Sequence, residues 1–102
     1  MIKAQINRED GQTQVLVIGH ADYADKGKDI VCAGVSALTQ TYVLEMETEK
    51  CKRLLIEDGV MDCVCIDSKE NDIRLSYLKK GLESIQSQFP HYLSLEVNKK
   101  IV

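Results

Sequence analysis

The sequence has few aromatic residues: among 102 residues it contains no Trp, one Phe and four Tyr. Proteins that bind single-stranded nucleic acid stack the bases on aromatic side chains, and this composition supplies few such platforms. Positive charge is also scarce, because 13 Lys and Arg stand against 16 Asp and Glu, a formal net charge of −3 at pH 7 without a basic stripe. We therefore expect no direct binding of nucleic acid.

Long apolar runs are missing as well. A bilayer-spanning helix needs roughly 20 apolar residues, and no run of that length occurs. In the first six residues apolar and polar side chains alternate, whereas a signal peptide has a continuous apolar segment. Neither end carries a lipidation motif. We expect a cytoplasmic protein without membrane association, folded as a single domain over residues 1–102. In such a reducing compartment the four Cys are expected to be free thiols.

Apolar periodicity predicts seven elements. Alternation indicates strands, whereas apolar residues three and four apart indicate helices. Asp-Gly pairs at Asp10 and Asp58 predict turns, and Pro90 ends the second helix. The expected strands cover residues 2–6, 15–19, 53–57, 60–67 and 93–97, and the expected helices cover residues 29–46 and about 68–89. The order ββαββαβ indicates an α+β fold, with two amphipathic helices on one face of a mostly antiparallel sheet of about five strands. The order of the strands in the sheet stays open.

The most informative stretch runs from Gly19 to Ser36. His20 follows a predicted strand, and Cys32 falls in the first turn of a predicted helix that Asp29 caps. The positive end of a helix favours a thiolate, and a nearby imidazole can take the thiol proton and return it to a leaving amine. Cys32 and His20 are therefore a candidate nucleophile and base.

This stretch closely resembles the bacterial ribosomal-processing cysteine protease family, Prp. The family pattern joins Gly-His-Ala, a variable loop, and Gly-x-Asp-Ile-Val-Cys-Ala-(Ala or Gly)-Val-Ser. Its parts occur here as residues 19–21, Gly27, and residues 29–36. The resemblance implies that Cys32 is the nucleophile and His20 the general base, that Asp29 and Ser36 support them, and that residues 21–28 form a mobile loop over the site.

The resemblance further implies an endopeptidase that removes the N-terminal extension of a large-subunit ribosomal protein precursor, number twenty-seven, after an aromatic-rich segment. It implies a homodimer and no cofactor. The substrate loop would include Gly19, Ala21, Asp22 and Gly27. The alternative is a non-catalytic ribosome-assembly factor that binds the same precursor while Cys32 is merely packed.

Two roles inside the motif follow from helix geometry. The unpaired N–H groups of the first turn, near Val31 to Ala33, are natural donors to an oxyanion. If Asp29 caps these groups it competes with the oxyanion, so we favour Asp29 orienting His20 or bounding the loop. Ser36 follows Cys32 by four residues on one helical face and is a candidate hydrogen-bond donor to the thiolate or the substrate.

The remaining candidates have plainer explanations. Cys63 and Cys65 lie on one face of a predicted strand, and we expect both to be thiols buried in the core. Zinc bound by these two with Cys51 and His20 is an alternative, but no Cys-x-x-Cys pair is present, and we expect no metal. His91 is expected at the surface. A final hypothesis is that Asp22 and Asp25 attract a basic ribosomal tail.

Overall fold

The structure is a computed structural model that describes residues 1–46 and 50–99. All seven expected elements are present, in the expected order. The strands are β1 (Ile2–Glu9), β2 (Gln12–Ile18), β3 (Cys51–Glu57), β4 (Val60–Ile66) and β5 (Leu93–Asn98), and the helices are α1 (Ile30–Glu45) and α2 (Lys69–Gln88). The α+β prediction is confirmed. The first helix ends one residue before the expected residue 46, and residues 47–49 lie outside the described residues.

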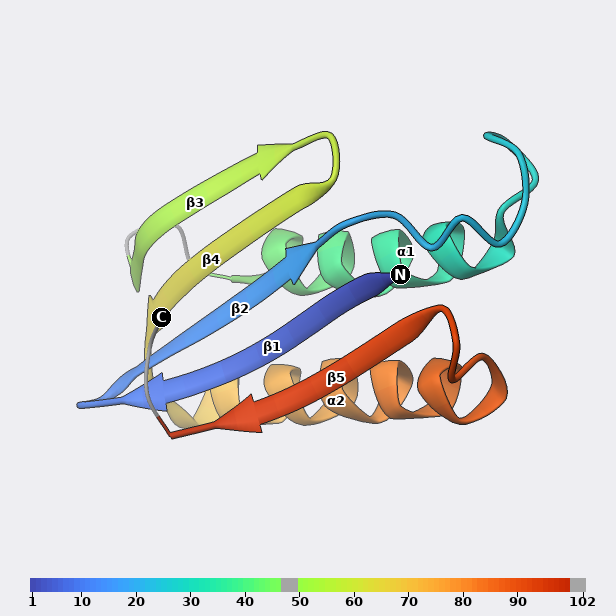
Figure 1. Ribbon diagram of the computed structural model, residues 1–102. Helices are drawn as coiled ribbons and strands as arrows, with labels where there is room; N and C mark the ends of the chain where they lie inside the picture. The colour runs from blue at the N-terminus through green and yellow to red at the C-terminus, as the bar shows by residue number, and fades with distance from the viewer. Residues whose placement is uncertain (47–49, 100–102) are drawn as a thin grey trace.

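The five strands form one sheet in the order β3-β4-β2-β1-β5. All neighbouring pairs are antiparallel except β1 and β5, which run parallel because α2 carries the chain back across the sheet. Figure 1 shows both helices on one face of this sheet, with α1 behind β2 and β4 and α2 behind β5. The β3 strand lies at one edge, so one side of its backbone has no neighbour within the sheet.

The core lies between the sheet and the two helices. Alternate residues of each inner strand face it, because side chains point to opposite faces along a strand. Its most completely buried apolar members include Ile6, Val15, Val31, Leu82 and Leu93. In α2 the buried apolar residues Leu75, Leu78 and Leu82 recur at helical spacing, and their burial holds the helix on the sheet.

Two tight turns connect the antiparallel strands, each with an Asp-Gly pair at its tip. The first turn consists of Asp10 and Gly11 alone, both with positive φ, so β2 begins three residues earlier than the expected residue 15. At the second turn Gly59 has a φ of 76°. This turn carries the β3–β4 hairpin toward the end of the sheet where β2 finishes, since Ile18 pairs with Val60.

Each helix begins at a side-chain cap. Ser68 caps α2 by accepting a hydrogen bond from the Asn71 N–H at 3.1 Å, and Phe89, directly before Pro90, is the C-cap of the helix. Asp29 caps α1, as expected. Among the residues that the structure describes, no helix is both long and apolar enough to cross a membrane.

Candidate active site

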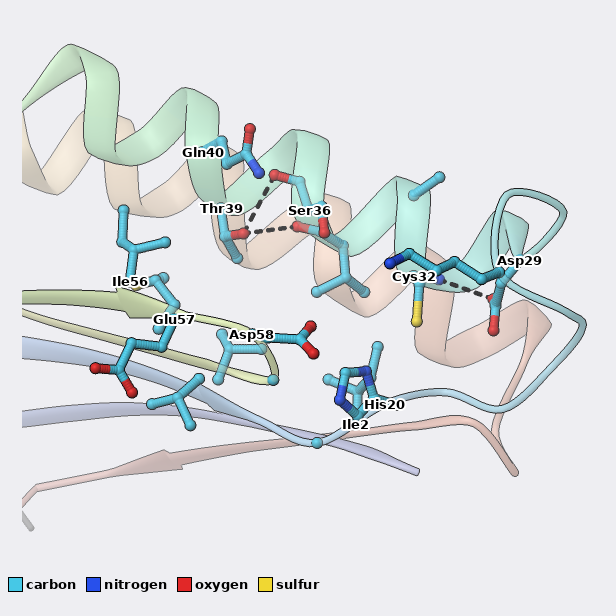
Figure 2. A pocket seen from close by; sticks show the side chains of 18 of the residues that line it. Ile2, His20, Asp29, Cys32, Ser36, Thr39, Gln40, Ile56, Glu57 and Asp58 are labelled. Atoms are coloured by element: carbon cyan, nitrogen blue, oxygen red, sulfur yellow. Dashed lines mark hydrogen bonds between the residues drawn. The ribbon is translucent and has the colours of Figure 1, made fainter.

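A pocket of about 500 Å³ lies where the loop between β2 and α1 meets the tip of the β3–β4 hairpin. Its lining brings together three segments that are far apart in the sequence: the loop after Gly19, one side of α1 from Cys32 to Val43, and residues 56–61. Figure 2 shows side chains from α1 and from the hairpin facing each other across it. His20, Cys32, Asp29 and Ser36 all line this one pocket.

Cys32 lies in the first turn of α1 and is half-buried. Its sulfur accepts a hydrogen bond from the backbone N–H of Ala21 at 3.3 Å. Ala21 itself is 2% exposed, so the loop is fixed against the helix at this point. An N–H group directed at the sulfur stabilises negative charge there, which suits a nucleophilic thiolate.

His20 follows the end of β2 and is exposed to the pocket. In Figure 2 the Cys32 sulfur projects from α1 toward the strand side of the pocket, where the His20 ring lies. The ring rests against the hairpin turn: a Cβ atom on Gly59 would lie 2.8 Å from His20 Nε2. The hairpin is also tied to the end of β2, because the Gly19 N–H donates to the Gly59 carbonyl at 2.9 Å.

Asp29 joins the helix start to the loop. Its Oδ1 accepts hydrogen bonds from the N–H groups of Val31 and Cys32 at 3.1 and 3.0 Å, and its Oδ2 accepts from Tyr23 and Ala24 at 3.0 and 3.4 Å. Burial favours the neutral acid, but these N–H groups together outweigh it and hold the pKa of the Asp29 carboxyl below its ordinary value.

These contacts agree with one of the two roles favoured for Asp29 and bear on the candidate oxyanion donors. Asp29 bounds the loop, and the described residues show no hydrogen bond between it and His20. The N–H groups of Val31 to Ala33, named from the sequence as candidate donors to an oxyanion, are all paired in this structure. Asp29 Oδ1 occupies two of them, and the Ala33 N–H donates to the Asp29 carbonyl at 3.1 Å. The physical reason is that a strong N-cap satisfies the same orphan donors that an oxyanion would need.

The other motif residues lie around the same pocket. Ser36 is exposed on its helical wall, and in the described part of the chain its side chain forms no hydrogen bond with the Cys32 sulfur. Gly19, Asp22 and Gly27 line the loop side, each with positive φ. Of the two acidic loop residues singled out in the sequence, Asp22 is part of the lining and Asp25 is not.

Sequence reasoning missed the aromatic anchor of the loop. The Tyr23 ring makes edge-to-face contacts with Phe89 and Tyr92, at centroid distances of 5.3 and 5.1 Å. These partners stand at the end of α2 and before β5, more than sixty positions away in the chain. No local pattern signals such a contact. Three of the five aromatic residues therefore gather beside the site.

The acidic hairpin tip was also missed. Glu57 and Asp58 line the pocket, and Figure 2 shows both on its strand side. The Asp-Gly signal was interpreted only as a turn. Because this turn borders the pocket of Cys32, its acidic side chains lie in the pocket wall. The sequence does not show this, because only the order of the strands in the sheet places the hairpin turn at the end of β2.

The other cysteines lie outside this pocket. Cys63 and Cys65 are each 1% exposed, in agreement with the expectation of core thiols. Burial raises the pKa of the Cys63 thiol to about 11 and raises the pKa of Cys65 further. Buried protonated thiols are poor nucleophiles, so Cys32 is the thiol that combines exposure with a histidine in its pocket.

Comparison with known proteins agrees with this geometry. The family model described as cysteine protease Prp matches residues 1–94. The chain belongs to the cysteine protease Prp family. Ribosomal processing cysteine protease Prp of Staphylococcus aureus is 52% identical over 33 residues, which are 32% of this chain. In that alignment the chain spans about a third of the length of the curated relative, namely 31%.

Solved structures of Prp extend the likeness over the whole fold. The S. aureus ribosomal processing protease Prp in complex with a covalently linked product peptide superposes with a TM-score of 0.82 at 26% identity. The same protein with a substrate peptide gives a TM-score of 0.76 at 25% identity. Each comparison covers 95% of this chain and 99% of the other. The α+β arrangement is thus that of a Prp peptidase.

Proposed function

We propose that this chain is a cysteine endopeptidase in which Cys32 is the nucleophile and His20 the general base. The observation that carries the proposal is the Cys32 sulfur at the start of α1, held by the Ala21 N–H and facing the pocket that His20 also lines. Membership of the Prp family supports it. So does the covalently linked product peptide bound to the S. aureus protein.

The reaction follows from these two side chains. His20 takes the thiol proton as the Cys32 sulfur bonds to the scissile carbonyl carbon. When the tetrahedral intermediate collapses, the C–N bond breaks, His20 gives the proton to the departing amine, and a thioester remains. A water molecule then attacks the thioester, its proton passes through His20, and the carboxylic acid leaves as the sulfur regains a proton. No cofactor takes part in any step.

The substrate proposed is the N-terminal extension of a large-subunit ribosomal protein precursor, number twenty-seven. The pocket continues from Cys32 along α1 past Thr39 to Val43, opposite Ile56 on the hairpin. This groove offers apolar contacts for the side chains that precede the cut and an acidic rim for a basic ribosomal segment. The ribosomal processing named for the S. aureus relatives supports this choice.

The test is mass spectrometry of a peptide that spans the extension and its junction, after incubation with the wild-type chain, with Cys32→Ala and with His20→Ala. We expect one cut, lost in Cys32→Ala and slowed by about 10²- to 10⁴-fold in His20→Ala, the usual contribution of a general base. His91→Ala is the matched control, because His91 is exposed and lies outside the pocket lining.

An uncut but bound peptide would instead favour the assembly-factor alternative. Alkylation with iodoacetamide near neutral pH separates the two. A catalytic Cys32 reacts fast and reacts more slowly in His20→Ala, whereas a merely packed thiol reacts slowly in both. Slow labelling that His20→Ala leaves unchanged would remove the dyad from the proposal.

A homodimer is proposed as the working form. Three apolar side chains on the outer surfaces of the helices stand 83%, 58% and 74% exposed, namely Leu44, Ile73 and Tyr77. A twofold contact would bury such surface in a domain of this size. Light scattering should give twice the chain mass of 11.5 kDa, and a monomer at micromolar concentration would contradict the proposal.

A further inference from the structure

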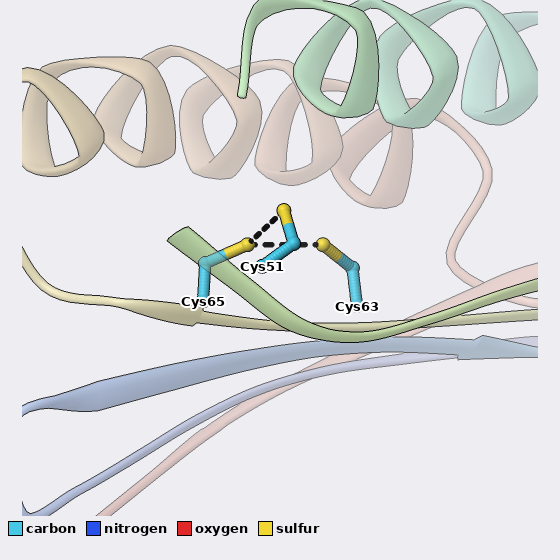
Figure 3. A group of neighbouring side chains, drawn as sticks. All are labelled: Cys51, Cys63 and Cys65. Atoms are coloured by element: carbon cyan, nitrogen blue, oxygen red, sulfur yellow. Dashed lines mark hydrogen bonds between the residues drawn. The ribbon is translucent and has the colours of Figure 1, made fainter. Parts of the chain in front are cut away.

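Three cysteine sulfurs converge at the end of the β3–β4 hairpin opposite its turn. Cys51, the first residue of β3, pairs directly with Cys65 on β4, and Cys63 lies two residues from Cys65 on the same face. The sulfur of Cys65 is 2.7 Å from that of Cys51 and 3.4 Å from that of Cys63, and all three lie within 4.8 Å of one another. Figure 3 shows the three side chains pointing to a common place between them.

Sequence spacing alone did not favour a metal ion at these three cysteines. A Cys-x-Cys pair on a strand offers two ligands on one face, which is too few for a metal ion. The antiparallel partner strand adds the third, because Cys51 stands directly across from Cys65. His20, the fourth ligand considered from the sequence, lies in the active-site pocket at the turn end of the hairpin and does not belong to the group.

We propose that Cys51, Cys63 and Cys65 bind one soft, thiophilic metal ion of the Zn²⁺ or Cu⁺ type. Thiolate sulfur is the ligand that such ions prefer, and bonds of about 2.3 Å place three sulfurs about 3.8–4.0 Å apart. The present separations reach this geometry when the sulfurs move apart by roughly 1 Å through side-chain rotation. Three S–H bonds break as three metal–sulfur bonds form, and the protons pass to solvent.

The number of thiols distinguishes this proposal from a simple disulfide. A Cys51–Cys65 disulfide would use two sulfurs and leave Cys63 as a buried core thiol. A metal ion uses all three and explains why each side chain turns toward the same point. One of the three, Cys51, is half-buried, so the site has an approach from solvent.

Such a site would fasten the edge strand of the sheet. Apart from its first residue, every residue of β3 is exposed, so little side-chain burial holds this strand to β4. The same hairpin carries Ile56 and Asp58 into the wall of the active-site pocket. A metal ion at its far end would therefore slow the opening of the hairpin without contacting the substrate groove.

The experiment uses the full chain with Cys32→Ser, which removes the thiol outside the group. After reduction, Cd²⁺ is titrated and the thiolate charge-transfer absorption in the near ultraviolet is followed, and Zn²⁺ affinity is measured by competition with a coloured chelator. We expect one ion per chain and a rise in Tm of at least about 4 °C with saturating Zn²⁺. In Cys51→Ser we expect neither the Cd²⁺ absorption nor the rise in Tm. Val64→Ala, a buried neighbour on the same strand, should keep the absorption.

Two outcomes would overturn the proposal. One is a chain with three titratable free thiols that gives no Cd²⁺ absorption. The other is a chain that, under the same reducing conditions, has lost two hydrogen atoms in mass and yields a Cys51–Cys65 cross-linked peptide, which would assign a disulfide instead. Neither outcome depends on the peptidase activity, so the proposal stands or fails separately from the proposed function.

Discussion

His20 and Gly59 are in direct steric relation: the place that a Cβ atom on Gly59 would fill lies 2.8 Å from His20 Nε2. Because Gly59 has no side chain, the imidazole of His20 can lie against the hairpin. The Gly59 carbonyl also accepts the Gly19 N–H, so the hairpin turn holds both the ring and the backbone next to it.

Gly59→Ala should therefore lower both activity and stability. The positive φ of Gly59 costs about 1–2 kcal/mol for any residue with a Cβ atom, and the Cβ atom displaces the His20 ring. For His20 as the proposed general base, a displacement of about 1 Å should cost about 10²-fold in rate. Peptide cleavage and urea unfolding measure the two effects.

Gly11→Ala is the matched control for this substitution. Gly11 has nearly the same φ, 75°, and no atom within 4 Å of its Cβ position. We expect a similar loss of stability with unchanged kcat. Equal losses of activity in the two variants would show that His20 does not depend on the open space at Gly59.

Asp29 should make stability depend on pH in the acid range. Its pKa is lower in the folded chain than in the unfolded chain, so its contribution is complete above the ordinary value of about 4 and is lost as the pH falls through the folded pKa. In Asp29→Asn, which keeps a capping side chain, the free energy of unfolding should fall less steeply between pH 5 and pH 3, a range of about one unit on either side of that value.

Ser68→Ala provides the comparison for the pH series. It removes the uncharged cap of α2 and should cost about 1 kcal/mol at every pH. If the stability of Asp29→Asn followed the wild-type pH profile, the Asp29 carboxylate would not be the group that causes the loss of stability at acid pH. Urea unfolding at a series of pH values measures all three chains.

Tyr23→Ala should release the loop. Two edge-to-face ring contacts are lost, each worth about 0.5–1.5 kcal/mol. We expect faster amide hydrogen exchange over residues 21–28 and faster alkylation of half-buried Cys32. Tyr77→Ala, at a tyrosine that is 74% exposed on α2, should change neither rate. Unchanged exchange in Tyr23→Ala would mean that the hydrogen bonds of the loop to Asp29 and Cys32 hold it without the ring contacts.

The acidic lining should select basic peptides. Asp22, Glu57 and Asp58 line the pocket, with Lys26 as the cation among the same lining residues. Asp58→Asn and Asp22→Asn should raise KM for a Lys- and Arg-rich peptide and weaken its dependence on salt, with little change in kcat. Asp25→Asn, outside the lining, should have a smaller effect. Identical salt dependence in all chains would exclude electrostatic selection here.

Much of this protein can be read from local sequence. Alternating and helical apolar patterns gave the elements, because burial on one face needs a fixed period along the chain. Asp29 was correctly predicted as a cap and residues 21–28 as a loop, since caps and turns depend on near neighbours. The motif around His20 and Cys32 gave the family, which the match over residues 1–94 confirms.

Only the tertiary structure decided which distant residues meet. The sheet order brings Gly59 under His20 and Cys51 across from Cys65, and packing at the end of α2 places Phe89 against Tyr23. Asp29 shows the same limit, because it hydrogen-bonds both the loop and the N–H groups of Val31 and Cys32, which were candidate donors to an oxyanion. Such contacts depend on how strands pair and helices pack over the whole chain, and no periodic pattern within one element encodes them.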